Sequence, residues 1–389
     1  MRTVTPGITR LLGPDRQLIA GRRVGVVCNP ASIDAQFRLA SDLLHDDPEV
    51  SLKAIFGPQH GFRSDVQDNM VETPHSRDRR RCVPVFSLYS ETREPTAKML
   101  DGIEVLVIDL QDVGTRVYTY MYTMANCMRA AARRGVRVVV CDRPNPIGGA
   151  VEGALLREPW TSFVGQYSIP MRHGLTIGEL ARVFNTEFGI NAELEVVPME
   201  GWEREMYFDE TGLPWVIPSP NLPTLDSAIV YPGAVLFEGT KLSEGRGTTR
   251  PFELIGAPWI DAESLAARMN NRGLPGIHFR PVYFEPTFQK HAKQTCGGCQ
   301  LHVTDRRAFK PLRTAVELIE EFHQQNPDYF AWREPPYEYE HDKEPIDILY
   351  GTDRLREAIA DGVSVGALVE TWGAEEENFQ QQSRPYLLY

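Results

Sequence analysis

Ile103 to Arg116 reads IEVLVIDLQDVGTR, and this stretch decides the fold. Its first half is an unbroken apolar run, Val105 to Ile108, and its second half turns polar from Asp109 onward. A short β-branched run bounded by polar residues and a glycine is typical of a strand buried on both faces. Such strands belong to parallel sheets covered by helices, and ligands of these sheets bind beyond the carboxyl ends of the strands. The charges that follow Ile108 are therefore the first indication of a site.

Around this stretch, strand-like and helix-like segments alternate over the first part of the chain. The alternation is typical of a doubly wound α/β fold. We therefore predict a Rossmann-like doubly wound parallel sheet for residues 1–150. The strands are expected at 23–27, 51–56, 83–88 and 136–140, beside the one described above, and the helices at 37–45, 96–101 and 118–134.

The pattern becomes less regular after the glycine-rich segment 148–153. We predict a second, smaller α+β domain for residues 151–389. An amphipathic helix is expected at 176–188, with Thr176 as its cap and Glu179 at the capping-box position. The other expected helices are 262–270, 314–325 and 352–361, and the other expected strands are 228–231, 235–237, 278–284 and 300–304.

The composition is that of an ordinary globular protein and limits the classes of partner. The chain has 389 residues, of which 42% are hydrophobic and 24% charged, with a formal net charge of −12. This acidic balance argues against nucleic acid as a partner. No apolar run approaches the roughly 18 residues that span a bilayer, and no signal-peptide h-region opens the chain. We therefore expect a cytoplasmic protein without membrane insertion, whose oligomeric state the sequence does not determine.

Several cofactor and metal classes are disfavoured by missing motifs. The turn after the first strand reads Asn-Pro-Ala-Ser at 29–32, not GxGxxG, and no Walker A, GxSxG or HExxH motif occurs. Cys296 and Cys299 form a single CxxC pair, whereas a zinc site normally needs a second pair or histidines at ligand spacing. We expect no cofactor and no metal, and the CxxC pair is left as a redox pair or a tight turn.

Each expected strand is followed by a polar tip. The tips of parallel strands meet at one edge of a sheet, so these residues would converge. Capping is an alternative for any single tip, because Asp and Asn often cap helices and Pro-Asn often forms turns. Five polar tips in succession favour a shared cleft. They contain Asn29, Gln59, His60, Glu91, Asp109, Gln111, Asp112, Asp142, Arg143 and Asn145.

The surplus of carboxylates indicates a class of chemistry. Glycoside hydrolysis needs two carboxyl groups, one to protonate the leaving oxygen and one to act as nucleophile or to activate water. In the loop at 243–250, glycines would let the backbone turn toward a ligand, and Arg246 and Arg250 could clamp a carboxylate. An internal ion pair, such as Glu244 with Arg250, is equally consistent with the charges. The carboxylate candidates are Glu91, Asp109, Asp112, Asp142, Glu238 and Glu244.

Aromatic side chains supply floors for sugar rings. Tyr118, Tyr120 and Tyr122 cannot all share one helical face. We expect Tyr118 near the site and one of the other two in the core.

Taken together, these motifs resemble those of the DUF1343 family along nearly the whole chain. The characterised members of that family are NamZ-type exo-β-N-acetylmuramidases, which are glycoside hydrolases. The resemblance rests on GPQHGF at 57–62, DLQDVG at 109–114, YTY at 118–120, DRPNP at 142–146, RHG at 172–174, PNLPT at 220–224, EGT at 238–240, SEGRGT at 243–248 and the closing YLLY at 386–389.

The resemblance implies a Rossmann-like domain, a smaller second domain and a site in the cleft between them. It implies release of N-acetylmuramic acid from the non-reducing end of peptidoglycan fragments, with the lactyl carboxylate held by Arg246 or Arg250. The residues expected to bind this saccharide are Asn29, Asp109, Gln111, Arg116, Tyr118, Arg143, Asn145, His173, Asn221, Glu238, Glu244, Arg246 and Arg250.

One departure concerns the expected catalytic residue. Muramidase-like relatives carry Pro-Glu-His-Gly, but this chain has Gln59, and an amide can neither donate an acidic proton nor act as a base. Glu91 or Asp112 would then work with Gln59 and His60 around the glycosidic oxygen. The alternatives are a different sugar specificity and a saccharide-binding protein without turnover. A nucleotide-dependent enzyme is the weakest reading, because the glycine-rich turn is missing.

Overall fold

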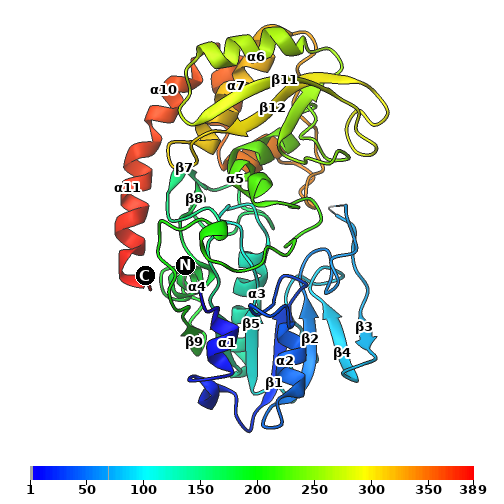
Figure 1. Ribbon diagram of the computed structural model, residues 1–389, viewed down its shortest axis with the longest axis vertical. Helices are drawn as coiled ribbons and strands as arrows, with labels where there is room; N and C mark the ends of the chain where they lie inside the picture. The colour runs from blue at the N-terminus through cyan, green and yellow to red at the C-terminus, as the bar shows by residue number, and fades with distance from the viewer. Residues whose placement is uncertain (1–2, 69) are drawn as a thin grey trace.

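The computed structural model describes residues 3–68 and 70–389, which form two lobes stacked along the long axis of the molecule (Figure 1). The lower lobe holds a seven-stranded sheet in the order β3-β4-β2-β1-β5-β6-β9. All neighbouring strands are parallel except β3, which runs antiparallel to β4 at the edge. The strands are β1 (Arg23–Cys28), β2 (Ser51–Gly57), β3 (Ser76–Asp78), β4 (Val83–Ser87), β5 (Val105–Asp109), β6 (Arg137–Cys141) and β9 (Leu194–Val197).

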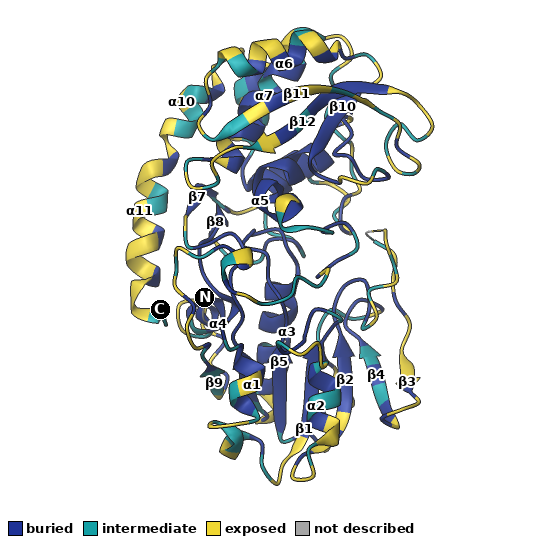
Figure 2. Cartoon of the chain, viewed as in Figure 1, coloured by how far each residue is buried: buried dark blue, intermediate teal, exposed yellow. Residues whose placement is uncertain are grey.

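The predicted doubly wound α/β class is confirmed, and so is the burial of the stretch that decided it. Every residue of β5 is buried, as expected for a strand covered on both faces. The helices α1 (Gly7–Leu11) and α2 (Ala40–Asp46) pack on one face of the sheet, whereas α3 (Tyr120–Arg134) and α4 (Ile177–Thr186) pack on the other. Figure 2 shows the resulting buried centre of this lobe. Helix α4 begins with the predicted capping box of Thr176 and Glu179.

The order of the strands defines where a ligand of this sheet should bind. From β1 the chain moves outward through β2 and β4, and it then returns to place β5 on the other side of β1. Such a reversal opens a crevice beyond the carboxyl ends of the two central strands. In the register of the sheet Cys28 pairs with Asp109, so both central strands end at the same level.

The upper lobe is built around an antiparallel sheet in the order β10-β12-β11, packed against α5, α6 and α7 (Figure 1). Between the lobes lies the two-stranded sheet of β7 (Glu152–Leu155) and β8 (Pro170–Arg172). The upper strands are β10 (Leu254–Ala257), β11 (Ile277–Phe284) and β12 (Cys296–Val303). The remaining α-helices are α5 (Leu225–Ala234), α6 (Ala262–Asn271), α7 (Pro311–Gln325), α8 (Pro345–Tyr350), α9 (Arg354–Ala360), α10 (Val365–Glu370) and α11 (Trp372–Ser383). Short 3₁₀ turns occupy Arg16–Leu18, Phe208–Glu210, Val235–Gly239 and Arg384–Tyr386.

The C-terminal helix α11 runs back along the outside of both lobes, and the chain ends beside α4 (Figure 1). The hydroxyl of Tyr389 donates to a carboxylate oxygen of Asp142 at 2.8 Å, at the end of β6. Two cysteines of the upper lobe, Cys296 and Cys299, lie in β12 with free thiols. No helix among the described residues is long and apolar enough to cross a membrane.

Two of the expected strands and one expected helix are wrong. Residues 228–231 and 235–237 lie in α5 and in the 3₁₀ turn after it, because this run is buried on all sides and a short apolar run does not distinguish strand from helix. Thr224 caps α5, and its hydroxyl accepts from the amide of Ser227 at 3.3 Å. Residues 96–101 form turns instead of a helix.

The division of the chain at residue 150 stays a prediction. The first sheet takes its last strand, β9, from beyond that residue.

Candidate active site

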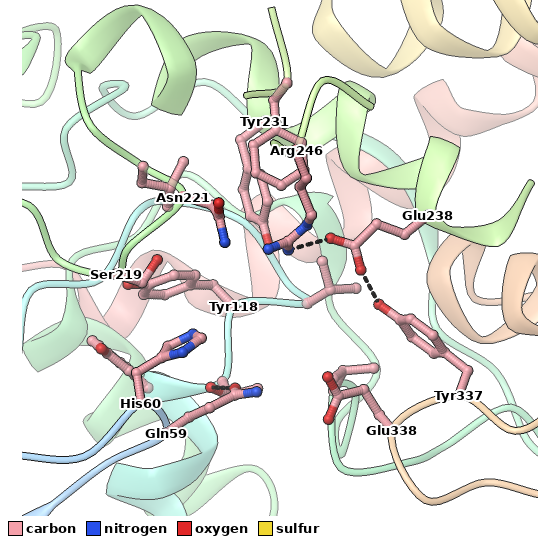
Figure 3. A pocket seen from close by; sticks show the side chains of 16 residues that line it. Gln59, His60, Tyr118, Ser219, Asn221, Tyr231, Glu238, Arg246, Tyr337 and Glu338 are labelled. Atoms are coloured by element: carbon pink, nitrogen blue, oxygen red, sulfur yellow. Dashed lines mark hydrogen bonds and ion pairs between the residues drawn. The ribbon is translucent and has the colours of Figure 1, made fainter. Parts of the chain in front are cut away.

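A pocket lies between the lobes, beyond the carboxyl end of the sheet, and Figure 3 shows its lining. The lower lobe and the connecting segments contribute Gln59, His60, Val117 to Tyr120, Val164, Ser219, Asn221 and Leu222. The upper lobe contributes Tyr231, Glu238, Arg246, Phe252, Tyr337 and Glu338.

A tight turn after β2 brings Gln59 and His60 into the pocket. The backbone φ of His60 is 67° and that of Gly61 is 82°, so the chain turns through the left-handed region. A side chain at Gly57 would place its Cβ 2.5 Å from the amide nitrogen of Phe62, so only glycine fits. The sequence GPQHGF therefore encodes a sharp return that presents its two central polar side chains to the ligand space.

His60 is a neutral acceptor in this site. Its Nδ1 lies 2.7 Å from the carbonyl oxygen of Val66, which can only accept, so Nδ1 carries the proton. Burial and the nearby charge of Arg246 lower the pKa of His60 from 6.5 to about 4. The imidazole is thus uncharged at neutral pH, and Nε2 is left with a free lone pair.

The cationic group of the pocket is Arg246, which stands on the glycine-rich loop after the 3₁₀ turn at 235–239. Its Nη2 donates to Oε1 of Glu238 at 2.6 Å, and its Nε lies 3.5 Å from Glu244. The guanidinium also stacks 5.1 Å from the ring centre of Phe252. Because Lys290 donates to Glu244 at 2.9 Å, the two carboxylates and two cations of this cluster balance.

Glu238 is held as a carboxylate. Its Oε1 accepts from Arg246, and its Oε2 accepts from the hydroxyl of Tyr337 at 2.8 Å. Burial alone would raise the pKa of Glu238, but the charge and hydrogen bond of Arg246 and the Tyr337 hydroxyl hold it below the usual range. Both carboxylate oxygens of Glu238 thus accept hydrogen bonds from other residues of the protein.

Glu338 is the second acidic group of the pocket, and unlike Glu238 it has a raised pKa. Burial raises the pKa of Glu338 from 4.5 to about 7, and the nearby Glu238 adds to the shift. Hydrogen bonds from Tyr89 and Gln59 and the charge of Arg246 oppose it. Glu238 and Glu338 are therefore two carboxyl groups whose pKa values are driven apart by their surroundings, as in acid–base pairs of known enzymes.

The pocket contains six of the residues that the sequence predicted to be catalytic or to bind the saccharide. They come from separate parts of the chain, namely Gln59, His60, Tyr118, Asn221, Glu238 and Arg246. Tyr118 also lines the pocket, whereas Tyr122 is fully buried and stacks with Phe184 in the core. Of the polar tips expected to meet the glycine-rich loop, the tip after β2 therefore lines the pocket together with Arg246 of that loop.

The structure does not bring Glu91 or Asp112 to this pocket. The side chain of Glu91 is 71% exposed and lies 3.1 Å from His75 on the surface. Asp112 is buried behind the pocket, where it accepts from the amide of Gly114 at 2.7 Å and contacts His173 at 3.2 Å. Glu91 thus lies on the surface and Asp112 is held through Oδ2 by Gly114 and His173, and neither side chain lines the pocket.

Other named residues support the structure and do not line the pocket. Arg143 forms a bidentate pair with Asp109, with contacts of 2.6 and 2.7 Å. Arg116 is fully buried and donates to four backbone carbonyls, of Ala154, Ile169, Leu349 and Tyr350. Gln111 and Asn145 donate to backbone carbonyls of neighbouring loops. Each of these polar groups satisfies buried backbone that no regular element pairs.

Three further named residues lie near the pocket without lining it. Asn29 donates to the hydroxyl of Tyr120 at 2.9 Å and so supports the floor from below. Glu244 stands behind Arg246. Arg250 is half-exposed and pairs with Glu253 at 3.1 Å, so the internal pair expected for Glu244 forms with Arg246 instead.

The sequence analysis did not single out Tyr231, Tyr337 or Glu338. Tyr231 lies in the segment that was predicted as a strand. The other two follow Pro335 and Pro336, and the available signal was an acid between two tyrosines in a segment without periodicity. No group of three or more His, Cys, Asp or Glu side chains in the described ranges is placed to hold a metal ion.

Family models match both halves of the chain. The N-terminal model of the exo-β-N-acetylmuramidase NamZ matches residues 24–226, and the C-terminal model matches residues 229–389. Together they span the sheet, the connecting segments and the upper lobe, including every residue of the pocket.

Known proteins agree with these matches. The peptidoglycan β-N-acetylmuramidase NamZ of Bacillus subtilis strain 168 is 44% identical over 387 residues, which cover 99% of this chain and 91% of that protein. A DUF1343 family protein from Bacteroides fragilis NCTC 9343 superposes with a TM-score of 0.91 at 35% identity, covering both chains completely. A second from the same organism has a TM-score of 0.77 at 28% identity, covering 99% of each chain. This chain therefore belongs to the exo-β-N-acetylmuramidase NamZ family, also known as DUF1343.

Proposed function

We propose that this protein is an exo-acting glycoside hydrolase that releases N-acetylmuramic acid from the non-reducing end of peptidoglycan fragments. The observation that carries the proposal is one pocket that holds a guanidinium, Arg246, together with two buried carboxyl groups, Glu238 and Glu338. Glycoside hydrolysis needs two carboxyl groups at the scissile bond. Membership in the NamZ family and the 44% identity to a peptidoglycan β-N-acetylmuramidase support the same conclusion.

Arg246 supplies the proposed selectivity for a muramic sugar. N-acetylmuramic acid differs from N-acetylglucosamine by a lactyl group that ends in a carboxylate. A guanidinium binds a carboxylate through charge-assisted hydrogen bonds, and Arg246 lines the pocket beside the aromatic rings of Tyr231 and Phe252. These rings offer apolar surface to the body of the sugar.

A single pocket also supports exo action. The site is bounded by residues of both lobes, an arrangement that suits one terminal sugar. The free lone pair of His60 Nε2 and the amide of Asn221 are the groups proposed to bind hydroxyl or N-acetyl groups of the terminal sugar.

The direct test is hydrolysis of 4-nitrophenyl N-acetylmuramide by the native chain, followed by the release of 4-nitrophenol. We expect turnover, and we expect the matching N-acetylglucosaminide to be a poor substrate because it lacks the carboxylate. The natural linkage is tested with a disaccharide of N-acetylmuramic acid and N-acetylglucosamine. Absence of product from both muramic substrates would contradict the proposal.

The amide at Gln59, in place of the expected glutamate, raises one alternative that the family match does not favour. In this alternative the pocket binds the saccharide and leaves it intact. Isothermal calorimetry with the disaccharide, combined with chromatography of the mixture, separates the two. Binding with no product would establish this alternative, whereas any enzyme-dependent cleavage would remove it.

The proposed substrate also bears on location and partners. We propose that the protein acts in the cytoplasm on imported peptidoglycan fragments and that it has no nucleic-acid partner, which its net charge of −12 supports. Cell fractionation followed by immunodetection tests the location. Recovery of the protein outside the cytoplasmic fraction would contradict it.

A further inference from the structure

We infer that Glu338 is the general acid of this pocket and gives the glycosidic oxygen the proton that Gln59 is unable to supply. The inference rests on the proposed function, and it goes beyond it by assigning the acid to a residue of the upper lobe. The partners of the two pocket acids and the backbone that carries Glu338 support this assignment.

Glu338 is one of two carboxyl groups among the described residues that line the pocket, and the other is already committed. Glu238 uses Oε1 for Arg246 and Oε2 for Tyr337. A carboxylate fixed in this way between a cation and a hydroxyl donor stays ionised and is a poor source of a proton. The acid therefore has to come from Glu338.

The hydrogen bond from Tyr89 bears on which oxygen of Glu338 carries the proton. The hydroxyl of Tyr89 accepts from the amide of Met70 at 3.1 Å, so its own hydrogen points to Oε2 of Glu338 at 2.9 Å. A neutral carboxyl group accepts preferentially through its carbonyl oxygen, so this hydrogen bond favours Oε1 as the oxygen that carries the proton. Gln59 also donates to this carboxyl group and opposes the neutral form, but burial outweighs it.

The surroundings keep this carboxyl group protonated near neutral pH. The groups that face it are Tyr89 and Gln59 from the lower lobe and Glu238, Arg246 and Tyr231 from the upper lobe. Burial and Glu238 favour the neutral form more strongly than the hydrogen-bond donors and Arg246 favour the charged form. A carboxyl group with a pKa of about 7 is matched to general acid catalysis at neutral pH.

The backbone at Glu338 is a second, independent indication. Tyr337 and Glu340 exchange both backbone hydrogen bonds at 2.9 Å, so Glu338 and Tyr339 form a two-residue hairpin turn. Their φ values are 45° and 70°, both in the left-handed region that normally requires glycine or asparagine. Such strain persists where the surroundings over-determine it, and it gathers at functional sites. Here it presents a carboxyl group to the pocket.

The hairpin is held from the other lobe, so its position is defined. The guanidinium of Arg93 stacks 4.0 Å from the ring centre of Tyr89 and 4.7 Å from that of Tyr339. This stack ties the hairpin, through Tyr339, to Tyr89 of the lower lobe, and Tyr89 in turn donates to the carboxyl group of Glu338.

The proton transfer follows a balanced course. As the bond between the anomeric carbon and the glycosidic oxygen breaks, its electron pair goes to the oxygen, which takes the proton of Glu338 and leaves as an alcohol. Water then adds its oxygen to the anomeric carbon, and the proton that it loses returns to the Glu338 carboxylate. The sum is hydrolysis of one glycosidic bond, with Glu338 regenerated.

The test compares Glu338→Gln with Glu152→Gln on two substrates. Glu152 is a matched control, since it is also buried with a pKa raised to about 7 by burial, but it lies outside the pocket and accepts from the amide of Arg313. With the disaccharide, whose leaving group needs a proton, we expect E338Q to lose about 10²–10⁴-fold in kcat/KM. With the 4-nitrophenyl sugar, whose leaving group departs without one, the loss should be much smaller, and E152Q should keep both activities.

The outcomes separate this inference from the proposed function. A native chain that cleaves neither substrate overturns both. An active native chain whose E338Q variant cleaves the disaccharide normally, or loses both activities equally, overturns the role of Glu338 alone. A second measurement needs the native protein alone. The alkaline limb of the pH profile of kcat/KM should lie near pH 7 with the disaccharide and should be absent with the 4-nitrophenyl sugar, because only the disaccharide needs the proton of Glu338. The same alkaline limb with both substrates, or none with the disaccharide, would equally overturn the inference.

Discussion

Two buried arginine–carboxylate pairs, one at the carboxyl end of the large sheet and one in the upper lobe, differ in what they leave free. Asp109 and Arg143 hold each other through two contacts of 2.6 and 2.7 Å, and Arg143 also donates to the carbonyl of Ile33 at 2.8 Å. Glu238 and Arg246 share one contact of 2.6 Å, and the guanidinium lines the pocket. Both are pairs of an arginine with a carboxylate. We call the first pair closed, because its guanidinium is occupied by contacts within the protein, and the second pair open, because its guanidinium lines the pocket.

The difference shows how to distinguish structural charges from functional ones. A bidentate pair with its remaining hydrogen bonds satisfied stabilises one backbone arrangement and offers nothing to a ligand. A pair with one contact, adjoining a neutral acid and an uncharged histidine, keeps donors for an incoming carboxylate. Both pairs were candidate binding residues in the sequence, and only their partners separate them.

The largest expected effect tests the closed pair. Replacing Arg143 with Met leaves Asp109 buried without its partner, and breaking a buried pair in this way costs about 3–5 kcal/mol. We expect the free energy of unfolding to fall by this amount in urea denaturation. The double variant Asp109→Asn with Arg143→Met removes both charges and should be less destabilised than the single one. A single variant within about 1 kcal/mol of the native protein would mean that the pair is not the structural support described here.

The second effect concerns the acid of the open site and its pH dependence. The folded-state pKa of Glu338, about 7, lies above its ordinary value of 4.5, so the folded protein favours the protonated form. Its contribution to stability is full below about pH 4.5 and is lost as the pH rises through 7. The difference in unfolding free energy between E338Q and the native protein should therefore move by about 2–3 kcal/mol in favour of the variant between pH 4.5 and pH 8.

This difference is measured by urea denaturation of both proteins at each pH. Comparing the two proteins cancels the other groups that titrate near neutral pH, including Asp142, whose pKa burial raises to about 7. A difference that is constant across this pH range would show that Glu338 titrates normally in the folded protein.

The third effect tests what the open pair offers to a ligand. Arg246→Met should weaken binding of N-acetylmuramic acid by about 2 kcal/mol, the size of a hydrogen bond to a charged group, and should affect N-acetylglucosamine much less. Arg250→Met is the control, because Arg250 is half-exposed and outside the pocket. Calorimetry with both sugars measures the effect. Equal weakening for the two sugars would assign Arg246 to structure instead of to carboxylate recognition.

Much of the fold was predictable because it depends on local patterns. The buried run at β5 and the alternation around it predicted the parallel sheet, and the capping box at Thr176 predicted the start of α4. The strands expected at 228–231 and 235–237 were wrong because their burial on every side erases the periodicity that distinguishes helix from strand.

The site was predictable where residues directly follow a strand or stand in and before the charged, glycine-rich loop at 243–250. Gln59 and His60 come immediately after β2, so the rule for strand ends found them. Glu338 stands on a hairpin about 280 residues later in the chain, and its importance arises from its burial against Tyr89 of the other lobe. Contacts of this kind depend on tertiary packing, which no local pattern encodes.

The smallest effect is expected from Gln59→Glu, which changes the neighbour of the proposed acid. A carboxyl group at residue 59 would face Glu338, and two such groups cannot both ionise easily, so they titrate as a pair. The alkaline limb of the pH profile of kcat/KM should move upward by about one pKa unit, equivalent to about 1.4 kcal/mol. Gln382→Glu adds the same charge on the exposed side of α11, far from the pocket, and should leave the profile in place. An alkaline limb that stays in place in Q59E would mean that the ionisation of residue 59 does not influence the ionisation of Glu338.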